Sequence, residues 1–291
     1  MEYIFLLITI VLVSAQNILA KQYNVKTKRP DALLLGFFSV LFALVFFLAD
    51  AGIEYGFKLR FSWEIVPYSV GFAVTYSMAV IGGIYAVQLG SLAVSSLISS
   101  YSLLIPTFYG VLFLNEDLSW AGLALLCISI FLINKSSGKS TVHFTLKWVI
   151  ALLLSFSGNG LCSTVQKMQQ LAFKNADYDF KNEFMIIALA IAAVILFVAW
   201  IVAVRNSKPE KITLKNSFLF GAPRGIANGI VNLLMIILAG TLPATILYPT
   251  VSAGGIVLGF FVAMFVYKEK LSSPQLVGYG IGVVSVILLN L

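Results

Sequence analysis

The sequence predicts an all-α membrane protein with about ten transmembrane helices in two inverted five-helix repeats. Hydrophobic residues make up 60% of the 291 positions and charged residues only 11%, which is too little polar material to cover a soluble protein. The apolar residues form continuous runs near the roughly 20 residues that a helix needs to cross a bilayer. These runs do not alternate with polar residues, so the strands of an outer-membrane barrel are not expected.

Charged residues and clusters of Gly, Pro and Asn divide the chain into ten apolar segments. The segments are Tyr3–Ala20, Ala32–Leu48, Ile65–Tyr85, Leu92–Leu114, Leu118–Ile133, Trp148–Val165, Phe184–Val204, Phe218–Ala239, Leu242–Val266 and Pro274–Leu289. The first has no basic stretch before it and no small-residue cleavage pattern after it, so we expect a mature helix and not a signal peptide. Short separators at 88–90 and 240–241 leave nine segments as an alternative count.

A polar stretch at 135–147 separates two halves of five segments each, and the halves share short motifs. The stretch from Phe113 to Ser119 (FLNEDLS) matches the stretch from Val266 to Ser272 (VYKEKLS), and Gly90-Ser91-Leu92 matches Gly240-Thr241-Leu242. We therefore expect a first repeat at residues 1–138 and a second at 139–291, together forming one membrane domain. Because each repeat has an odd number of helices, the second must enter the membrane in the opposite orientation.

Each half closes with a Glu-x-Leu-Ser turn and a last helix that contains glycine, and in this the chain resembles the EamA-type drug/metabolite transporters. The likeness covers nearly the whole chain. Its sharpest part runs from Leu242 to Tyr248 (LPATILY) and from Ser252 to Leu258 (SAGGIVL), which is also similar to the third helix of small multidrug resistance proteins. The resemblance implies a transporter of small organic molecules.

The chain departs from the small multidrug resistance proteins at one informative position. Those proteins carry a membrane glutamate eight residues before a lysine near the end of their first helix, and this carboxylate binds protons and cationic drugs. Lys21 and Lys167 match the lysine, but Val13 and Asn159 stand where the glutamate would be. We therefore do not expect export of cations through that carboxylate.

Arg224 is the one charge well inside a predicted helix, where its insertion costs about 2.5–3.5 kcal/mol. Asn228 and Asn232 follow one and two turns later, so the three side chains share a stripe. We expect this stripe to face a cavity or polar partners. The alternative is that Arg224 reaches the headgroups and the Asn residues bond to neighbouring helices. Glycines at 221, 225 and 229 predict close helix packing.

Amide and aromatic side chains complete the candidate site. Amides inside a bilayer need partners, so we expect them to point inward, and tyrosines provide aromatic walls for a ligand or, alternatively, belong to the interface belts. The candidate substrate-binding residues are Asn17, Tyr76, Asn159, Arg224, Asn228, Tyr248 and Ser252.

These features favour a secondary transporter of a small organic metabolite across the cytoplasmic membrane by alternating access, with an amino acid or similar carboxylated solute preferred. We expect a small-molecule substrate and the lipid bilayer as partners, no nucleic acid, no cofactor, no metal, and a monomer or homodimer. The alternatives are a lipid-linked-sugar flippase, an accessory membrane subunit, or an exporter of organic cations held by aromatic residues. The sequence shows no group of His, Asp, Glu or Cys at membrane depth, so an enzyme is not expected. It also shows no Walker-type loop, so coupling to ATP is not expected.

The distribution of cations predicts the orientation. Loops after odd-numbered segments contain thirteen Lys and Arg residues, whereas loops after even-numbered segments contain five. Lys and Arg favour the cytoplasmic side, so the charge count predicts both termini outside. The EamA resemblance implies cytoplasmic termini instead.

Overall fold

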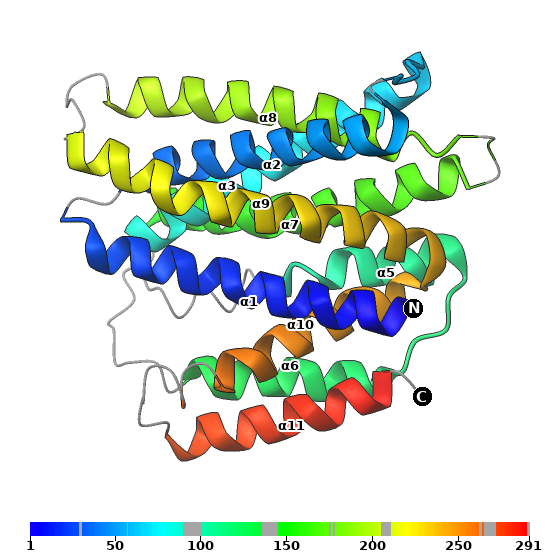
Figure 1. The fold of residues 1–291 in the computed structure, drawn as a ribbon. Helices are drawn as coiled ribbons and strands as arrows, with labels where there is room; N and C mark the ends of the chain where they lie inside the picture. Colours follow the sequence, from blue (N-terminus) through cyan, green and yellow to red (C-terminus); the bar gives the residue numbers. More distant parts are fainter. Residues whose placement is uncertain are drawn as a thin grey trace.

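The computed structural model describes residues 1–28, 31–56, 58–89, 101–135, 145–174, 176, 178–204, 211–261, 264 and 272–289. Within these residues the chain forms a helical bundle (Figure 1). Its helices are α1 (Glu2–Lys26), α2 (Ala32–Tyr55), α3 (Val66–Leu89), α5 (Leu104–Leu114), α6 (Trp120–Lys135), α7 (Leu146–Ala172), α8 (Lys181–Val204), α9 (Lys211–Thr241), α10 (Ala244–Phe261), α11 (Ser273–Leu289) and the short 3₁₀ helix η1 (Trp63–Ile65).

Six of these helices are long and apolar enough to cross a membrane, namely α1, α2, α3, α7, α8 and α9. The described parts of α5 and α6 are shorter apolar helices. No strand occurs in the described ranges. The expectation of an all-α, multi-pass membrane fold is confirmed at this level.

The helices extend beyond the apolar segments that predicted them. The first segment was expected to end at Ala20, but α1 continues to Lys26, and α9 begins at Lys211 instead of Phe218. A helix satisfies its own backbone hydrogen bonds, so it continues through polar residues where the chain reaches the headgroup region. Apolar length therefore marks the hydrocarbon core and not the helix ends.

Some sequence predictions fall outside the described residues. These are Gly90-Ser91 and the first part of the fourth segment (residues 90–100), and most of the repeat motif in the second half (residues 265–271).

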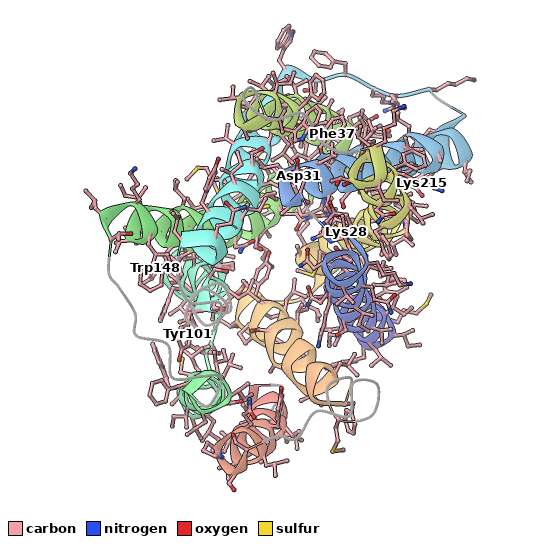
Figure 2. All side chains as sticks on the ribbon, turned by 90° about the vertical axis from the view of Figure 1, so that its left-hand side faces the viewer. Lys28, Asp31, Phe37, Tyr101, Trp148 and Lys215 are labelled. Carbon is pink, nitrogen blue, oxygen red and sulfur yellow. The ribbon has the colours of Figure 1, made fainter. Side chains whose placement is uncertain are left out.

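The interior lies where α2, α3, α8 and α9 meet. Its core contains Phe47, Phe72, Phe184, Leu196 and Ile236, each with no exposed surface. Around it, α3 lies along α7, α2 along α9, and α1 along α9, while α6 and α11 pack on each other at one side (Figures 1 and 2). A second cluster joins α1, α9 and α10 around the buried Tyr248.

Helix α9 approaches α2 through its glycine stripe. A Cβ at Gly225 would collide with the backbone oxygen of Ser39, and one at Gly229 would lie 2.6 Å from the Phe46 ring. The expectation that these glycines allow close packing is confirmed. This close approach brings the middle of α9, with Arg224, against the polar part of α2.

The start of α1 and the end of α11 lie at the same end of the bundle (Figure 1), which we call the termini end. The connections α2–α3, α5–α6, α7–α8 and α9–α10 also lie there. Figure 2 is seen from the opposite end, near which Lys28 and Lys215 lie.

Candidate functional site

Arg224 is half-buried near the middle of α9. It follows the exposed Lys215 by nine residues on α9, which corresponds to about 14 Å along the helix axis. The expected alternative, in which Arg224 sits within about two turns of a helix end and reaches the headgroups, assumed that α9 begins near Phe218. The Ser39 hydroxyl of α2 binds one guanidinium nitrogen inside the bundle and Nε is buried, so a snorkelling arginine is disfavoured here.

In the described part of the chain, the guanidinium of Arg224 makes one hydrogen bond. Its Nη1 donates to the Ser39 hydroxyl on α2 at 3.0 Å, while that hydroxyl donates to the Leu35 carbonyl at 2.7 Å. Nε is buried without a hydrogen-bond partner. Among the described residues, no carboxylate forms an ion pair with Arg224. The described residues thus leave the charge of Arg224 unneutralised and its Nε donor unused.

Amide side chains form a chain of hydrogen bonds next to Arg224. Asn228 Nδ2 donates to Gln16 Oε1 of α1 at 3.2 Å, and Asn232 Nδ2 donates to Asn228 Oδ1 at 3.0 Å. Gln166 Nε2 of α7 donates to the Asn232 carbonyl at 3.3 Å. The two Asn residues therefore bond to neighbouring helices, as the alternative interpretation expected, and they also extend the polar stripe from Arg224.

Tyr76 connects this network to the aromatic core. Its hydroxyl lies 3.5 Å from Asn228 Oδ1, at the limit of a hydrogen bond, and its ring stacks on Phe72 with centroids 5.7 Å apart. The phenol also lies within electrostatic range of the Arg224 guanidinium. Helices α1, α2, α3, α7 and α9 all contribute polar atoms to this region, which we call the central polar cluster: Gln16, Ser39, Tyr76, Gln166, Arg224, Asn228 and Asn232.

The structure does not bring every candidate residue into this cluster. Asn17 is exposed on α1 and lies outside the cluster. Adjacent residues of a helix are about 100° apart, and packing on α9 turns Gln16, not Asn17, toward Asn228. Asn159 is half-buried on α7 and lies seven residues before Gln166, which places both on one face.

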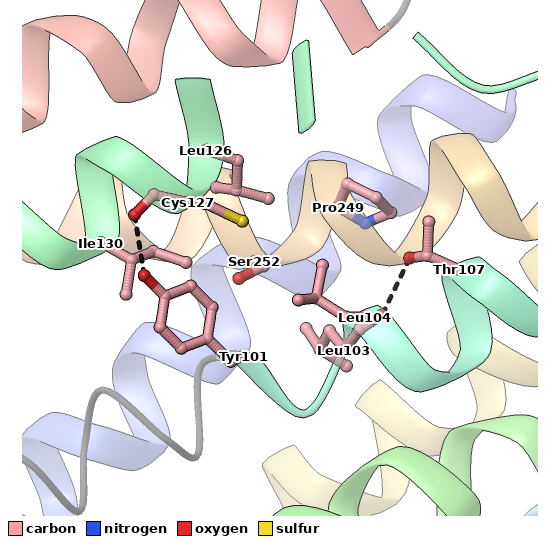
Figure 3. A pocket seen from close by; sticks show the side chains of 9 residues that line it. All are labelled: Tyr101, Leu103, Leu104, Thr107, Leu126, Cys127, Ile130, Pro249 and Ser252. Carbon is pink, nitrogen blue, oxygen red and sulfur yellow. Dashed lines mark hydrogen bonds between the residues drawn. The ribbon is translucent and has the colours of Figure 1, made fainter. Parts of the chain in front are cut away.

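The two candidates on α10 lie elsewhere. Tyr248 is fully buried and its hydroxyl donates to the Ser163 carbonyl of α7 at 2.8 Å. Ser252 lines a small pocket between α5, α6 and α10, together with Tyr101, Cys127 and Pro249 (Figure 3). In that pocket the Tyr101 hydroxyl donates to the Cys127 carbonyl. Ser252 therefore belongs to a different space from Arg224.

Ser39 was absent from the residues selected on sequence. A single serine in an apolar segment gives no signal by itself, because it can hydrogen-bond within its own helix. Gln16 and Gln166 are also amides within apolar segments, but the sequence offers no reason to select them over Asn17 and Asn159. Only the packing of α9 against α1, α2 and α7 identifies these partners.

Ionic side chains also join α2 to α8 at the termini end. Lys181 Nζ lies 2.8 Å from Glu54 Oε1, and Glu183 Oε1 accepts from the Tyr178 hydroxyl at 2.7 Å and the Arg60 amide at 2.9 Å. Burial and the hydrogen bond to Glu183 raise the pKa of Tyr178, which keeps this phenol protonated as a donor. In the part of the chain that was searched, no group of three or more acidic, Cys or His side chains could hold a metal ion.

Comparison with known proteins identifies the fold without a function. No family model matches the chain, and no curated protein matches it. Among solved structures 29 chains match. One of them is described only as "Crystal structure of protein". The match covers 99% of this chain and 95% of that chain, at a TM-score of 0.77 and 14% sequence identity. At that identity the likeness shows a shared fold alone.

Proposed function

We propose that this protein is a secondary transporter that moves a small carboxylated metabolite, such as an amino acid, across the cytoplasmic membrane by alternating access. The observation that carries the proposal is Arg224, a half-buried cation in the middle of α9 whose Nε is enclosed and which has no carboxylate partner among the described residues. Ionisable side chains inside membranes are costly, and they are typically retained where they bind a substrate or an ion.

The geometry of Arg224 favours a carboxylate as the ligand. Ser39 occupies Nη1, which leaves the edge formed by Nε and Nη2. A carboxylate binds such an edge through two parallel, charge-assisted hydrogen bonds. Asn228 and Tyr76 stand beside it with groups that can orient the rest of a small polar molecule. A cationic solute would meet repulsion from Arg224 at the same place.

The helix packing supports the proposed inverted repeat of residues 1–138 and 139–291. If α1, α2, α3, α5 and α6 correspond to α7, α8, α9, α10 and α11, then most contacts occur in exchanged pairs. The contact between α3 and α7 then corresponds to the contact between α9 and α1. In the same way, the α2–α9 contact corresponds to the α8–α3 contact, and the α1–α10 contact corresponds to the α7–α5 contact. Two inverted halves around a central site are the architecture of many transporters that work by alternating access.

The central polar cluster contains residues of both proposed halves. Gln16, Ser39 and Tyr76 come from the first, and Gln166 and Arg224 come from the second. A ligand bound there would contact both, so that motion of one half against the other would change its exposure to the two sides of the membrane.

The test is a ligand screen followed by transport. Purified protein is heated with amino acids, nucleosides, sugars or quaternary amines, since a ligand of the folded state raises Tm by mass action. We expect carboxylated solutes to raise Tm, their uncharged amide analogues to fail, and the same solutes to be taken up by proteoliposomes. Stabilisation by quaternary amines alone would favour an exporter of organic cations and contradict the proposal.

A further inference from the structure

Glu116 holds a defined position in the turn between α5 and α6 at the termini end. Asn115 ends α5 in the left-handed conformation, with φ of 52°. The amide of Glu116 then donates to the Gly110 carbonyl at 3.1 Å. The turn therefore directs the Glu116 side chain back over the last turn of α5 and toward α10.

The Glu116 carboxylate contacts two elements of the other proposed half. Its Oε2 accepts from the amide of Thr245 at 3.0 Å and from the Thr245 hydroxyl at 3.3 Å, so that it caps the start of α10. Its Oε1 lies 3.7 Å from Nζ of Lys167 on α7. Lys167 Nζ also donates to the Leu242 carbonyl at 2.7 Å, in the connection between α9 and α10.

This network is buried and closely packed. The side chains of Lys167 and Glu116 are 4% and 14% exposed, which leaves little room for water. A Cβ at Gly110 would collide with Glu116 Oε2 and would lie 3.0 Å from the Cβ of Ala244. Glycine at this position thus makes room for the carboxylate between α5 and α10.

The network is also linked to the central polar cluster. Lys167 directly follows Gln166, whose amide donates to the carbonyl of Asn232. Tyr248, one turn after Thr245 on α10, donates to the Ser163 carbonyl one turn before Lys167 on α7. A displacement of α7 relative to α10 at the termini end would therefore reach the cluster around Arg224.

We propose that Glu116 and Lys167 form the gate that closes the transport pathway at the termini end, and that their contact breaks when the pathway opens to that side. The inference rests on the proposed alternating access. Glu116 comes from residues 1–138, while Lys167 and Thr245 come from 139–291, so separation of the proposed halves at this end breaks both contacts of Glu116 together. The bond from Lys167 to the Leu242 carbonyl lies within the second half and is kept.

The chemistry of the pair suits a contact that forms and breaks. Two buried charges attract each other strongly when water is excluded, but they bear a large desolvation penalty in doing so. When the halves separate, water solvates both charges and compensates for the lost contact. An ionic gate can therefore close firmly and still open at moderate cost, provided that opening admits water.

The native Cys162 provides a reporter beneath the gate. It lies on α7 five residues before Lys167, packs against the core and contacts the side chain of Thr75. Replacing Cys127 with serine leaves Cys162 as the only thiol of the chain. Its rate of reaction with a membrane-impermeant thiosulfonate then measures water access to the pathway, since the thiolate is the reactive form.

The rate is measured in right-side-out and in inverted membrane vesicles that contain the Cys127→Ser protein. We expect Glu116→Gln and Lys167→Met each to accelerate labelling from the termini end at least tenfold. Labelling from the opposite end should not become faster, because alternating access opens the pathway to one side at a time. The double variant should be no faster than the faster single variant, because the two residues act as one unit. Glu116→Asp, which keeps the charge but shortens the reach, should accelerate labelling less.

The matched control is Lys181→Met, which removes the Glu54–Lys181 ion pair at the same end, where Lys181 is 15% and Glu54 39% exposed. It should leave the rate unchanged. Equal acceleration from both ends, or an equal acceleration in the Lys181 variant, would indicate general loosening of the bundle and contradict the proposed gate. Unchanged rates in the Glu116 and Lys167 variants would also contradict it. Labelling needs no added solute, so this experiment tests the gate independently of the carboxylate substrate. Either proposal can therefore be contradicted while the other holds.

Discussion

At the scale of single residues, Arg224 combines a high cost of burial with few structural contacts. Its described hydrogen bond is to one neutral hydroxyl, that of Ser39. Ser39 keeps its bond to the Leu35 carbonyl when the arginine is removed. The side chain thus contributes little to folding relative to what its insertion costs, and its effect should be on binding.

We predict that Arg224→Ala reduces uptake of an anionic or zwitterionic substrate by about tenfold or more, because each lost charge-assisted hydrogen bond contributes about 1.5–3 kcal/mol. Arg224→Lys should recover only part of the activity, since an ammonium cannot bind both carboxylate oxygens in parallel. Uptake is measured in proteoliposomes, with size-exclusion chromatography and Tm as controls for folding. Normal uptake by the alanine variant would mean that Arg224 does not bind substrate.

The second prediction compares Asn159 with Val13, which occupy corresponding positions in the proposed repeats. Asn159→Ala should reduce transport more than Val13→Ala, because only the amide offers hydrogen bonds to a ligand. Asn159 shares a face of α7 with Gln166, which supports this expectation. Initial uptake rates at equal protein density provide the measurement. Equal, mild losses would assign the polar face of α7 to helix packing.

At the scale of elements, the contact between α2 and α9 places Arg224. It depends on Gly221, Gly225 and Gly229, which lie one turn apart on α9 and meet Phe38, Ser39 and Phe46 of α2. Small residues allow two helix backbones to approach closely in a membrane, where association depends on van der Waals packing.

We predict that Gly225→Ala destabilises the protein by about 1–3 kcal/mol, because its Cβ would collide with the Ser39 backbone and would lie 2.6 Å from the Phe42 Cβ. Gly255→Ala on α10 is the matched control, since none of the described residues lies within 4 Å of a Cβ there. The control should be neutral or slightly stabilising, as alanine has the higher helix propensity. Thermal denaturation in detergent measures both variants. A Gly225 variant as stable as the control would contradict the close approach.

At the scale of the whole molecule, the two ends of the bundle differ in charge. Described cations gather near the opposite end, including Lys26, Lys28, Lys211 and Lys215. The termini end carries Glu54, Glu116, Asp117, Asp179 and Glu183. This asymmetry agrees with the count of loop charges along the sequence, and it favours the opposite end as the cytoplasmic one.

The orientation is tested with single cysteines in a background that lacks Cys127 and Cys162. Lys58→Cys lies at the termini end and Lys28→Cys at the opposite end, and both native side chains are exposed. We predict that an impermeant maleimide modifies the Lys58 variant in intact cells and spares the Lys28 variant until the cells are opened. The reverse pattern would place both termini in the cytoplasm, as the EamA resemblance implies.

The sequence by itself determined the class of the protein and the approximate position of its membrane segments. An apolar run of sufficient length must become a helix in a bilayer, because no water is present to satisfy its backbone groups. For the same reason Arg224 could be recognised as unusual without a structure, since the cost of a charge depends on its depth in an apolar segment.

The tertiary structure alone decided which polar groups meet. Gln16 faces Asn228 although Asn17 is its neighbour, Ser39 receives Arg224, and Glu116 reaches Lys167 across the proposed halves. In a largely apolar helix the local pattern leaves the rotation about the helix axis weakly determined. Packing against neighbouring helices sets that rotation, and with it the partners of every polar side chain in the interior.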